Sequence, residues 1–157
     1  MLSGSINLQT KINPFHYAFK VKDLAGTRAF YIDILGCKEG RSTDTWVDFD
    51  FYGHQLSAHL GKVEPLDFIG KVDGIDVPIP HFGCLLTYEQ FNTLAKRLEN
   101  ANVEFLVKPQ TRYEGKSGQQ QTMFVLDFSG NPLEFKSFND DSEIFMGSES
   151  ISKKQYS

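Results

Sequence analysis

The sequence predicts an α+β fold built from two tandem modules, each with the order strand, helix and three strands (βαβββ). The first observation is a repeated turn, because residues 50–56 read DFYGHQL and residues 127–133 read DFSGNPL. The second is a histidine that follows a proline near the start of each half, in PFHY at 14–17 and IPHF at 79–82. Both landmarks occur in the same order, so we interpret the halves as copies of one module.

The first module is expected over residues 12–60. The apolar and aromatic stretch FHYAFKV at 15–21 predicts a strand. Asp23 is a good N-cap, apolar residues then recur at helical spacing up to Leu35, and Gly36 follows as a C-cap, which predicts a helix. Three further strands are predicted at residues 37–41, 46–51 and 55–60.

The second module is expected over residues 79–138, after a turn-rich linker at 61–78. A helix is predicted to start at Thr87, where Gln90 three residues later completes a capping-box pattern. The remaining segments are predicted as strands at 81–86, 103–107, 122–126 and 133–138, with a mobile polar insertion at 110–121. The polar residues 1–11 and the acidic, serine-rich residues 139–157 are expected to be flexible tails.

The composition indicates an ordinary soluble protein, with 40% hydrophobic and 23% charged residues. The net charge of −4 gives no basic surface for nucleic acid. There is no apolar run of about eighteen residues, so no membrane span is predicted, and residues 1–10 lack the pattern of a secretory signal. The two cysteines, Cys37 and Cys84, form no short-spaced motif, which favours reduced thiols in the cytoplasm.

Three side chains are candidate metal ligands. His16 and His81 occupy equivalent places on the first strands of the two modules, and Glu134 lies on a strand directly after the repeated turn. Two imidazoles and one carboxylate from three strands form the facial set that is typical of non-haem Fe(II). A lone histidine on a strand is more often a hydrogen-bonded core residue, and the repeat is what reverses that preference.

The first module has no carboxylate that matches Glu134, because the repeat aligns that residue with Ser57. His59 lies two residues further along the same strand face, as either a fourth ligand or an acid–base group. His54 lies beside Gly53 in the turn and is expected to be exposed to solvent. His59 is therefore the candidate catalytic residue.

These features resemble the vicinal oxygen chelate superfamily, which includes glyoxalase I, extradiol dioxygenases, fosfomycin-resistance transferases and bleomycin-binding proteins. The resemblance covers residues 12–138, and its motifs are similar to the single-domain branch described as predicted extradiol dioxygenases. They are PFHYAFKVKDL at 14–24, the spacing FYxxxLGC at 30–37, TWVDFDFYGHQL at 45–56, VPIPHFG at 77–83 and DFSGNPLEFK at 127–136.

The resemblance implies an open cup of eight strands with a metal on its floor, held by His16, His81 and Glu134. It favours Fe(II), with Mn(II), Zn(II) or Ni(II) as alternatives, and ring cleavage of a small aromatic diol or a related oxygen-chelating substrate with O₂. The resemblance also implies a homodimer, formed by pairing or exchanging modules.

The sequence departs from the extradiol signature at two positions. Phe124 stands where those enzymes usually carry a tyrosine, and Phe128 stands where a proline usually follows the aspartate. Tyr17, Tyr52 or Tyr113 could replace the missing phenol, so we expect Tyr17, Tyr52 and Phe124 at the substrate.

Three other classes compete with an oxygenase. A fosfomycin-type transferase also uses two histidines and one glutamate, with Mn²⁺, but it would need a cationic substrate pocket, and the predicted inner strand faces carry no cluster of Lys or Arg. A glyoxalase-like isomerase or lyase would use Zn²⁺ or Ni²⁺ and a fourth ligand, and Ser57 argues against it unless His59 substitutes. A metal-free binding protein of the bleomycin-resistance type would not need three ligand residues in register.

Overall fold

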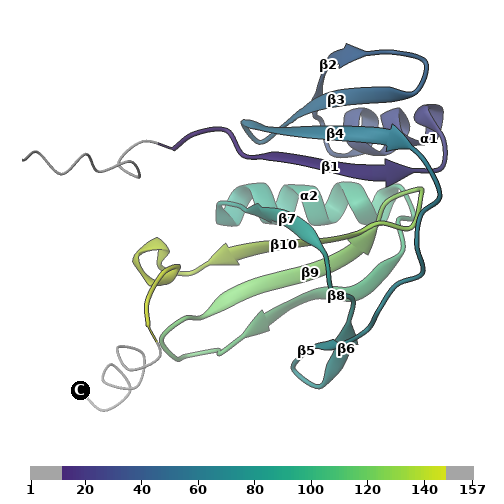
Figure 1. The fold of residues 1–157 in the computed structure, drawn as a ribbon. Helices are drawn as coiled ribbons and strands as arrows, with labels where there is room; N and C mark the ends of the chain where they lie inside the picture. Colours follow the sequence, from purple (N-terminus) through teal and green to yellow (C-terminus); the bar gives the residue numbers. More distant parts are fainter. Residues whose placement is uncertain (1–11, 148–157) are drawn as a thin grey trace, which may run out of the picture.

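The computed structural model describes residues 12–147, and Figure 1 shows two larger sheets with a helix beside each. The expected flexible tail at 1–11, and the part of the expected C-terminal tail at 148–157, lie outside the described residues. None of the described helices is both long and apolar enough to cross a bilayer.

Module one has the predicted βαβββ order and forms a four-stranded sheet in the order β1-β4-β3-β2. Strand β1 runs parallel to β4, and the other neighbours are antiparallel. The helix α1 continues into π-helical turns over Ala29–Ile34. The bounds are β1 His16–Val21, α1 Leu24–Arg28, β2 Lys38–Ser42, β3 Trp46–Phe51 and β4 His54–Leu60.

Module two repeats this arrangement in a second sheet, in the order β7-β10-β9-β8. Its first strand again runs parallel to its last, as β7 does to β10. The repeated topology confirms the fold predicted from the two sequence landmarks. The bounds are β7 Phe82–Leu85, α2 Tyr88–Asn100, β8 Phe105–Arg112, β9 Gln120–Leu126 and β10 Pro132–Phe138.

The local signals at the helix ends act as predicted. The Asp23 carboxylate accepts from Gly26 N at 2.5 Å, and the Thr87–Gln90 capping box is complete. Gly36 has φ of +80°, a conformation that residues with a Cβ rarely adopt, and it ends the first helix.

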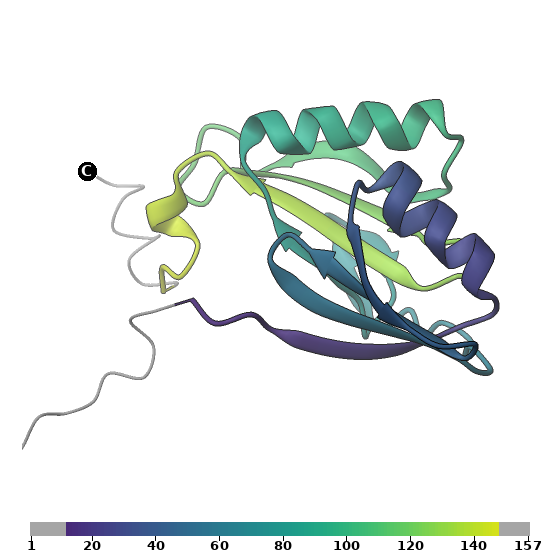
Figure 2. The same ribbon diagram turned by 90° about the horizontal axis from the view of Figure 1, so that it is seen from above.

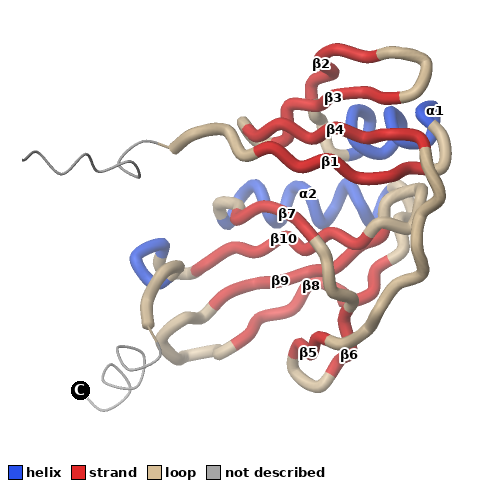
Figure 3. The backbone as a smooth tube through the Cα atoms, in the orientation of Figure 1, coloured by secondary structure: helices blue, strands red, loops and turns tan. Residues whose placement is uncertain are grey.

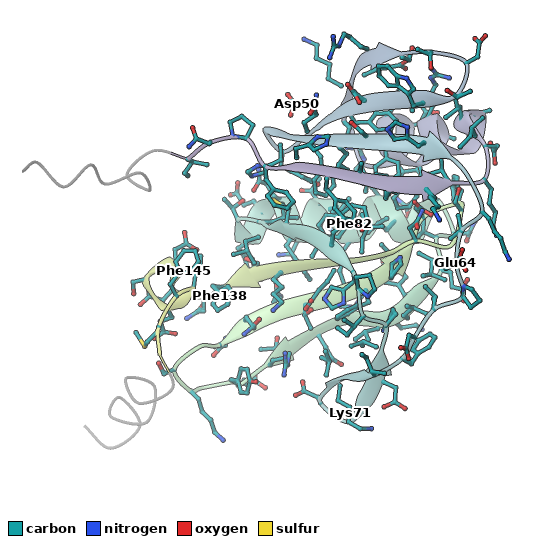
Figure 4. The ribbon with its side chains drawn as sticks, viewed as in Figure 1. Asp50, Glu64, Lys71, Phe82, Phe138 and Phe145 are labelled. Carbon is teal, nitrogen blue, oxygen red and sulfur yellow. The ribbon has the colours of Figure 1, made fainter. Side chains whose placement is uncertain are left out.

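The two sheets lie side by side, with their edge strands β1 and β7 adjacent (Figure 1). Figure 2 shows both helices on the same side of the sheets. One hydrophobic core fills the space between helices and strands and joins both modules, with Phe30, Phe49, Phe91 and Phe135 wholly or almost wholly buried. Phe82, labelled in Figure 4, lies at this junction, and its ring packs on Tyr17 with 4.9 Å between the ring centroids. Each of the two sheets therefore has a second face that points away from the helices, which we call its open face.

The linker contains an element that the sequence did not predict. Residues Gly70–Val72 and Ile75–Val77 form a hairpin, β5–β6, and Figure 3 shows the long loop that leads to it from β4. Val72 and Val77 pack on Val107 and Phe124 in a second hydrophobic cluster. The hairpin thus covers part of the face of module two that the helices leave open, while module one has no such cover among the described residues.

Two segments expected to be mobile are ordered. The polar insertion mostly extends the β8–β9 hairpin, which leaves a turn at 113–119. Residues 139–147 include a 3₁₀-helix, Asp141–Glu143. The buried Glu143 accepts hydrogen bonds from Ser117 Oγ and Gly118 N of that turn, and polar contacts of this kind leave no hydrophobic period in the sequence.

Candidate metal centre

His81 and Glu134 meet on the open face of module two. His81 lies directly before β7, and Glu134 lies within β10. Gly83 is paired with Glu134 in the sheet, so residues 81 and 134 leave the sheet on the same face. His81 Nε2 lies 3.0 Å from Glu134 Oε2, with the two side chains 20% and 10% exposed.

The hydrogen bonds around His81 determine which ring nitrogen faces Glu134. His81 Nδ1 lies 2.7 Å from the carbonyl oxygen of Pro78. A carbonyl oxygen only accepts, so Nδ1 carries the hydrogen. A neutral His81 would therefore point the lone pair of Nε2 at a carboxylate oxygen, and two acceptors would face each other. A proton between the two atoms, carried by Nε2 or by the carboxyl group, or a cation bound by both atoms, makes this contact favourable.

The surroundings favour a charged pair when no metal is bound. The hydrogen bond to Glu134 raises the pKa of His81, although desolvation acts to lower it. Burial acts to raise the pKa of Glu134, but the hydrogen bonds from His81 and Thr122 and the charges of Lys136 and His81 together outweigh it, and the pKa falls. Thr122 Oγ1 donates to Glu134 Oε1 at 2.7 Å, and Lys136 Nζ lies 3.7 Å from the same oxygen.

His16 holds the equivalent place in module one. Ala18 is paired with Ser57 in β4 as Gly83 is paired with Glu134 in β10, and each histidine lies two residues before that pair. The backbone register therefore supports the alignment that the two sequence motifs suggested. The His16 ring is exposed, and its Nδ1 lies 2.8 Å from Gln55 Oε1.

The expectation that His16, His81 and Glu134 converge within one chain is wrong. Among residues 12–147 of a single chain, no group of three or more His, Cys, Asp or Glu side chains is placed to hold a metal. The reason is the side-by-side packing of the modules, with both helices on one side (Figure 2). Equivalent side chains on two such sheets point the same way and not toward each other.

A comparison with protein families gives a match over residues 13–135 to the Glyoxalase/Bleomycin resistance protein/Dioxygenase superfamily. The chain belongs to this superfamily. A comparison with curated proteins finds no match.

Several solved structures share the fold of this chain. A glyoxalase/bleomycin resistance protein/dioxygenase from Alicyclobacillus acidocaldarius is 31% identical, with a TM-score of 0.69 over 85% of this chain and 96% of that chain. The fosfomycin resistance protein FosX from Listeria monocytogenes is 19% identical, with a TM-score of 0.65 over 85% and 98%. An integron cassette protein from V. cholerae is 21% identical, with a TM-score of 0.56 over 83% and 98%. The last two likenesses concern the fold alone.

A cavity beside His81 occupies the junction between the two modules of this superfamily member. Its volume is about 520 Å³, and it is lined by residues of the edge strands β1 and β7 and of the linker. Tyr17, one of the expected substrate contacts, lines it together with His81, Phe82, Ile79 and Pro132. Tyr17 is thus placed beside one candidate ligand.

The other two expected substrate contacts lie elsewhere. Tyr52 has φ of +51° in the turn after β3, and its ring packs on Phe51 and Phe135. It lines a hollow next to α2, on the helix side of the sheet. Phe124 is completely buried, with its ring edge-on to His81 at 4.9 Å between centroids. Phe124 packs on the His81 ring and has no surface left for a substrate.

His59 does not reach the His81–Glu134 pair within one chain. It lies on β4 of the other sheet, exposed, and stacks on Trp46 at 6.1 Å between ring centroids. His54, expected to be free in solvent, is half-buried and accepts a hydrogen bond from Phe15 N at 2.8 Å.

Sequence reasoning missed Asp48 and Gln55. Asp48 is 7% exposed and accepts from Ser57 Oγ at 2.5 Å. Gln55 Nε2 lies 3.4 Å from Asp48 Oδ2. The signal was present, because the alternation of residues 46–51 places Asp48 on the same strand face as Trp46, opposite the buried phenylalanines.

Proposed function

We propose that this chain is a divalent-metal oxygenase of the extradiol ring-cleaving type, acting on a small aromatic diol or a related substrate that chelates metal through two oxygens. The observation that carries the proposal is the contact between His81 Nε2 and Glu134 Oε2 at 3.0 Å. Two ligand atoms at right angles around a cation, each about 2.1 Å from it, are about 3 Å apart. The pair therefore fits two adjacent positions of an octahedral site.

In this proposal the third ligand comes from a second copy of the chain. His16 is exposed on the open face of its sheet, and its Nδ1 is engaged by Gln55, which leaves Nε2 outward. Within residues 12–147 of one chain, His16 does not form a ligand group with His81 and Glu134. A dimer that sets the open face of module one on that of module two would bring His16 of one copy to His81 of the other. His16 of the partner subunit would then complete a two-histidine, one-carboxylate set.

The protein's own residues would fix the metal and shape the site around it. The Pro78 carbonyl holds the His81 tautomer, and Thr122 and Lys136 hold Glu134 in its ionised form. When bound, Fe(II) supplies open positions for two substrate oxygens and the redox chemistry that O₂ requires. The cavity beside His81, with Tyr17 on its wall, is where we place the apolar part of the substrate.

Metal analysis and oxygen consumption test the chemistry. Protein purified without oxygen should hold about one Fe(II) per chain and consume O₂ when given catechol, and Glu134→Gln should do neither. Tightly held Zn²⁺ or Ni²⁺ without oxygen consumption would replace this proposal with a glyoxalase-like isomerase or lyase. No bound metal at all would replace it with a small-molecule binding protein.

A heterodimer tests the shared site. His16→Ala and His81→Ala are each expected to abolish metal binding as homodimers. A heterodimer of the two variants, isolated through two different tags, contains one intact site and should bind about half the metal of the wild-type dimer. If each site belonged to one chain, both chains of the heterodimer would be defective and no metal would bind.

A further inference from the structure

Three hydrogen-bonded side chains, Asp48, Gln55 and His16, form a row on module one. Asp48 on β3 is buried, Gln55 and His16 are exposed, and all three lie on the open face of the sheet. His16 Nδ1 lies 2.8 Å from Gln55 Oε1, and Gln55 Nε2 lies 3.4 Å from Asp48 Oδ2. His16 is paired with Gln55 in the sheet register, and Asp48 with Ser57.

The chemistry of these groups allows only one arrangement of hydrogens. An ionised carboxylate only accepts, so Asp48 must face the NH₂ group of Gln55. That fixes the amide, and its oxygen then faces His16 Nδ1. A carbonyl oxygen only accepts as well, so Nδ1 carries the hydrogen and the lone pair of the neutral ring is on Nε2. The buried carboxylate thus decides which nitrogen of His16 can bind a metal.

Module two reaches the same result by other means. His81 is held with hydrogen on Nδ1 by the main-chain carbonyl of Pro78. In module one this task falls to a side chain. Ser57 stands at the position of Glu134 but has no carboxylate. A carboxylate is supplied instead by Asp48 on the neighbouring strand β3, and Ser57 Oγ donates a hydrogen bond to it at 2.5 Å. Asp48 is fixed from both sides, by Ser57 and by Gln55.

We propose that Gln55 and Asp48 are positioning residues for His16, which hold its ring in the Nδ1–H form with Nε2 free to bind the metal of the partner subunit. This inference rests on the proposed function for its metal. The tautomer itself belongs to the metal-free protein and can be observed there.

The first measurement is the ¹⁵N spectrum of the histidine rings in metal-free protein at pH about 8, where an ordinary histidine is neutral. Wild-type His16 should show the Nδ1–H form. Gln55→Ala should shift it toward the Nε2–H form, which a free imidazole prefers in water. Asp48→Asn should shift it partway, because the amide of Gln55 is then free to turn over. The control is Gln110→Ala, since Gln110 also donates to an aspartate at 3.4 Å but lies on β8.

The second measurement is the affinity for Mn²⁺, chosen because it needs no oxygen control. Gln55→Ala should lower the affinity 10–100-fold, roughly the usual loss when a group that orients a ligand is removed. The double variant Asp48→Asn/Gln55→Glu exchanges amide and carboxylate and keeps both hydrogen bonds. It should bind Mn²⁺ more tightly than either single variant, whereas residues with only a structural role would give the double variant the summed defect.

The two measurements separate the two claims. If wild-type His16 shows the Nε2–H form, or the double variant is no better than the single variants, the positioning role is wrong. If His16 shows the Nδ1–H form and responds to Gln55→Ala, but the wild type binds no divalent metal, the positioning role stands and the proposed function fails.

Discussion

Module one and module two have the same topology and the same histidine in register, yet only module two brings that histidine to a carboxylate. In module two, His81 and Glu134 are partly buried beside a hairpin that covers part of the open face of their sheet. In module one, His16 is exposed, and the carboxylate lies one strand further away at Asp48. The two modules thus share the placement of backbone positions, while the side chains at those positions differ, and in the proposed function they supply different ligands of one metal site.

The largest expected contrast between the modules is at Gly83 and its counterpart Ala18. A Cβ at position 83 would lie 1.5 Å from the backbone oxygen of Glu134, so Gly83→Ala must push β7 away from β10. We expect a loss of about 3 kcal/mol or more in the free energy of unfolding, together with loss of metal binding. Ala18→Gly should cost only about 1 kcal/mol. Urea unfolding of both variants measures the difference, and equal losses would contradict the close approach.

The next contrast is between the aspartates of the repeated turn. Asp127 is buried and accepts hydrogen bonds from the Tyr31 hydroxyl at 2.8 Å and from the backbone of Ser129 and Asn131. Asp50 is exposed, and within residues 12–147 its carboxylate accepts a hydrogen bond from Gly53 N alone.

We therefore expect Asp127→Ala to cost about 3 kcal/mol, because several buried donors lose their partner, and Asp50→Ala to cost about 1 kcal/mol. Thermal unfolding of the two variants provides the comparison. A smaller effect at Asp127 than at Asp50 would show that the hydrogen bonds of Asp127 with Tyr31, Ser129 and Asn131 do not stabilise the fold.

A smaller effect is expected in the hairpin that covers module two. Val77 is 2% exposed and packs on Val107 and Phe124. Val77→Ala should cost about 1–2 kcal/mol and speed hydrogen exchange of amides 70–77. Amides of β3 and β4 should keep their protection, because module one does not share this cluster. Faster exchange throughout both modules would show that the hairpin and the main core unfold together.

The smallest effect is the pH dependence of the metal-free protein. The pKa of His81 is raised from 6.5, so its stabilising contribution is complete below that value and is lost as pH rises through the raised pKa. The pKa of Glu134 is lowered from 4.5, so its contribution is present above that value and is lost as pH falls through the lowered pKa. The ion pair of His81 and Glu134 therefore stabilises the protein fully between about pH 4.5 and about pH 6.5.

Urea unfolding in the presence of a chelator, measured from about pH 4 to about pH 9, tests this dependence. The free energy of unfolding should decline above about pH 6.5, and His81→Gln should remove that decline. His16→Gln is the matched variant from module one, and it should leave the pH profile as it is. A decline that persists in His81→Gln would assign it to another group.

Much of the fold could be predicted from sequence because its signals are local. The helix caps at Asp23 and Thr87, the glycine at the end of the first helix and the alternation along β3 each depend on a few neighbouring residues. The hairpin at 70–77 was missed because its two short strands carry only Val72 and Val77 as buried residues, too few for a hydrophobic period. The order of residues 139–147 was missed because it depends on polar contacts with a distant turn.

The sequence by itself determined the two modules, the equivalence of His16 and His81, and Glu134 as the carboxylate beside a histidine. Repeat landmarks and strand alternation are sufficient for this, because they fix which face of a sheet each side chain occupies. Only the tertiary structure decided that the modules pack side by side and that His16 faces Gln55 and not His81. That packing is set by the shared core between helices and sheets, whose contacts join residues far apart in the chain and leave no local pattern.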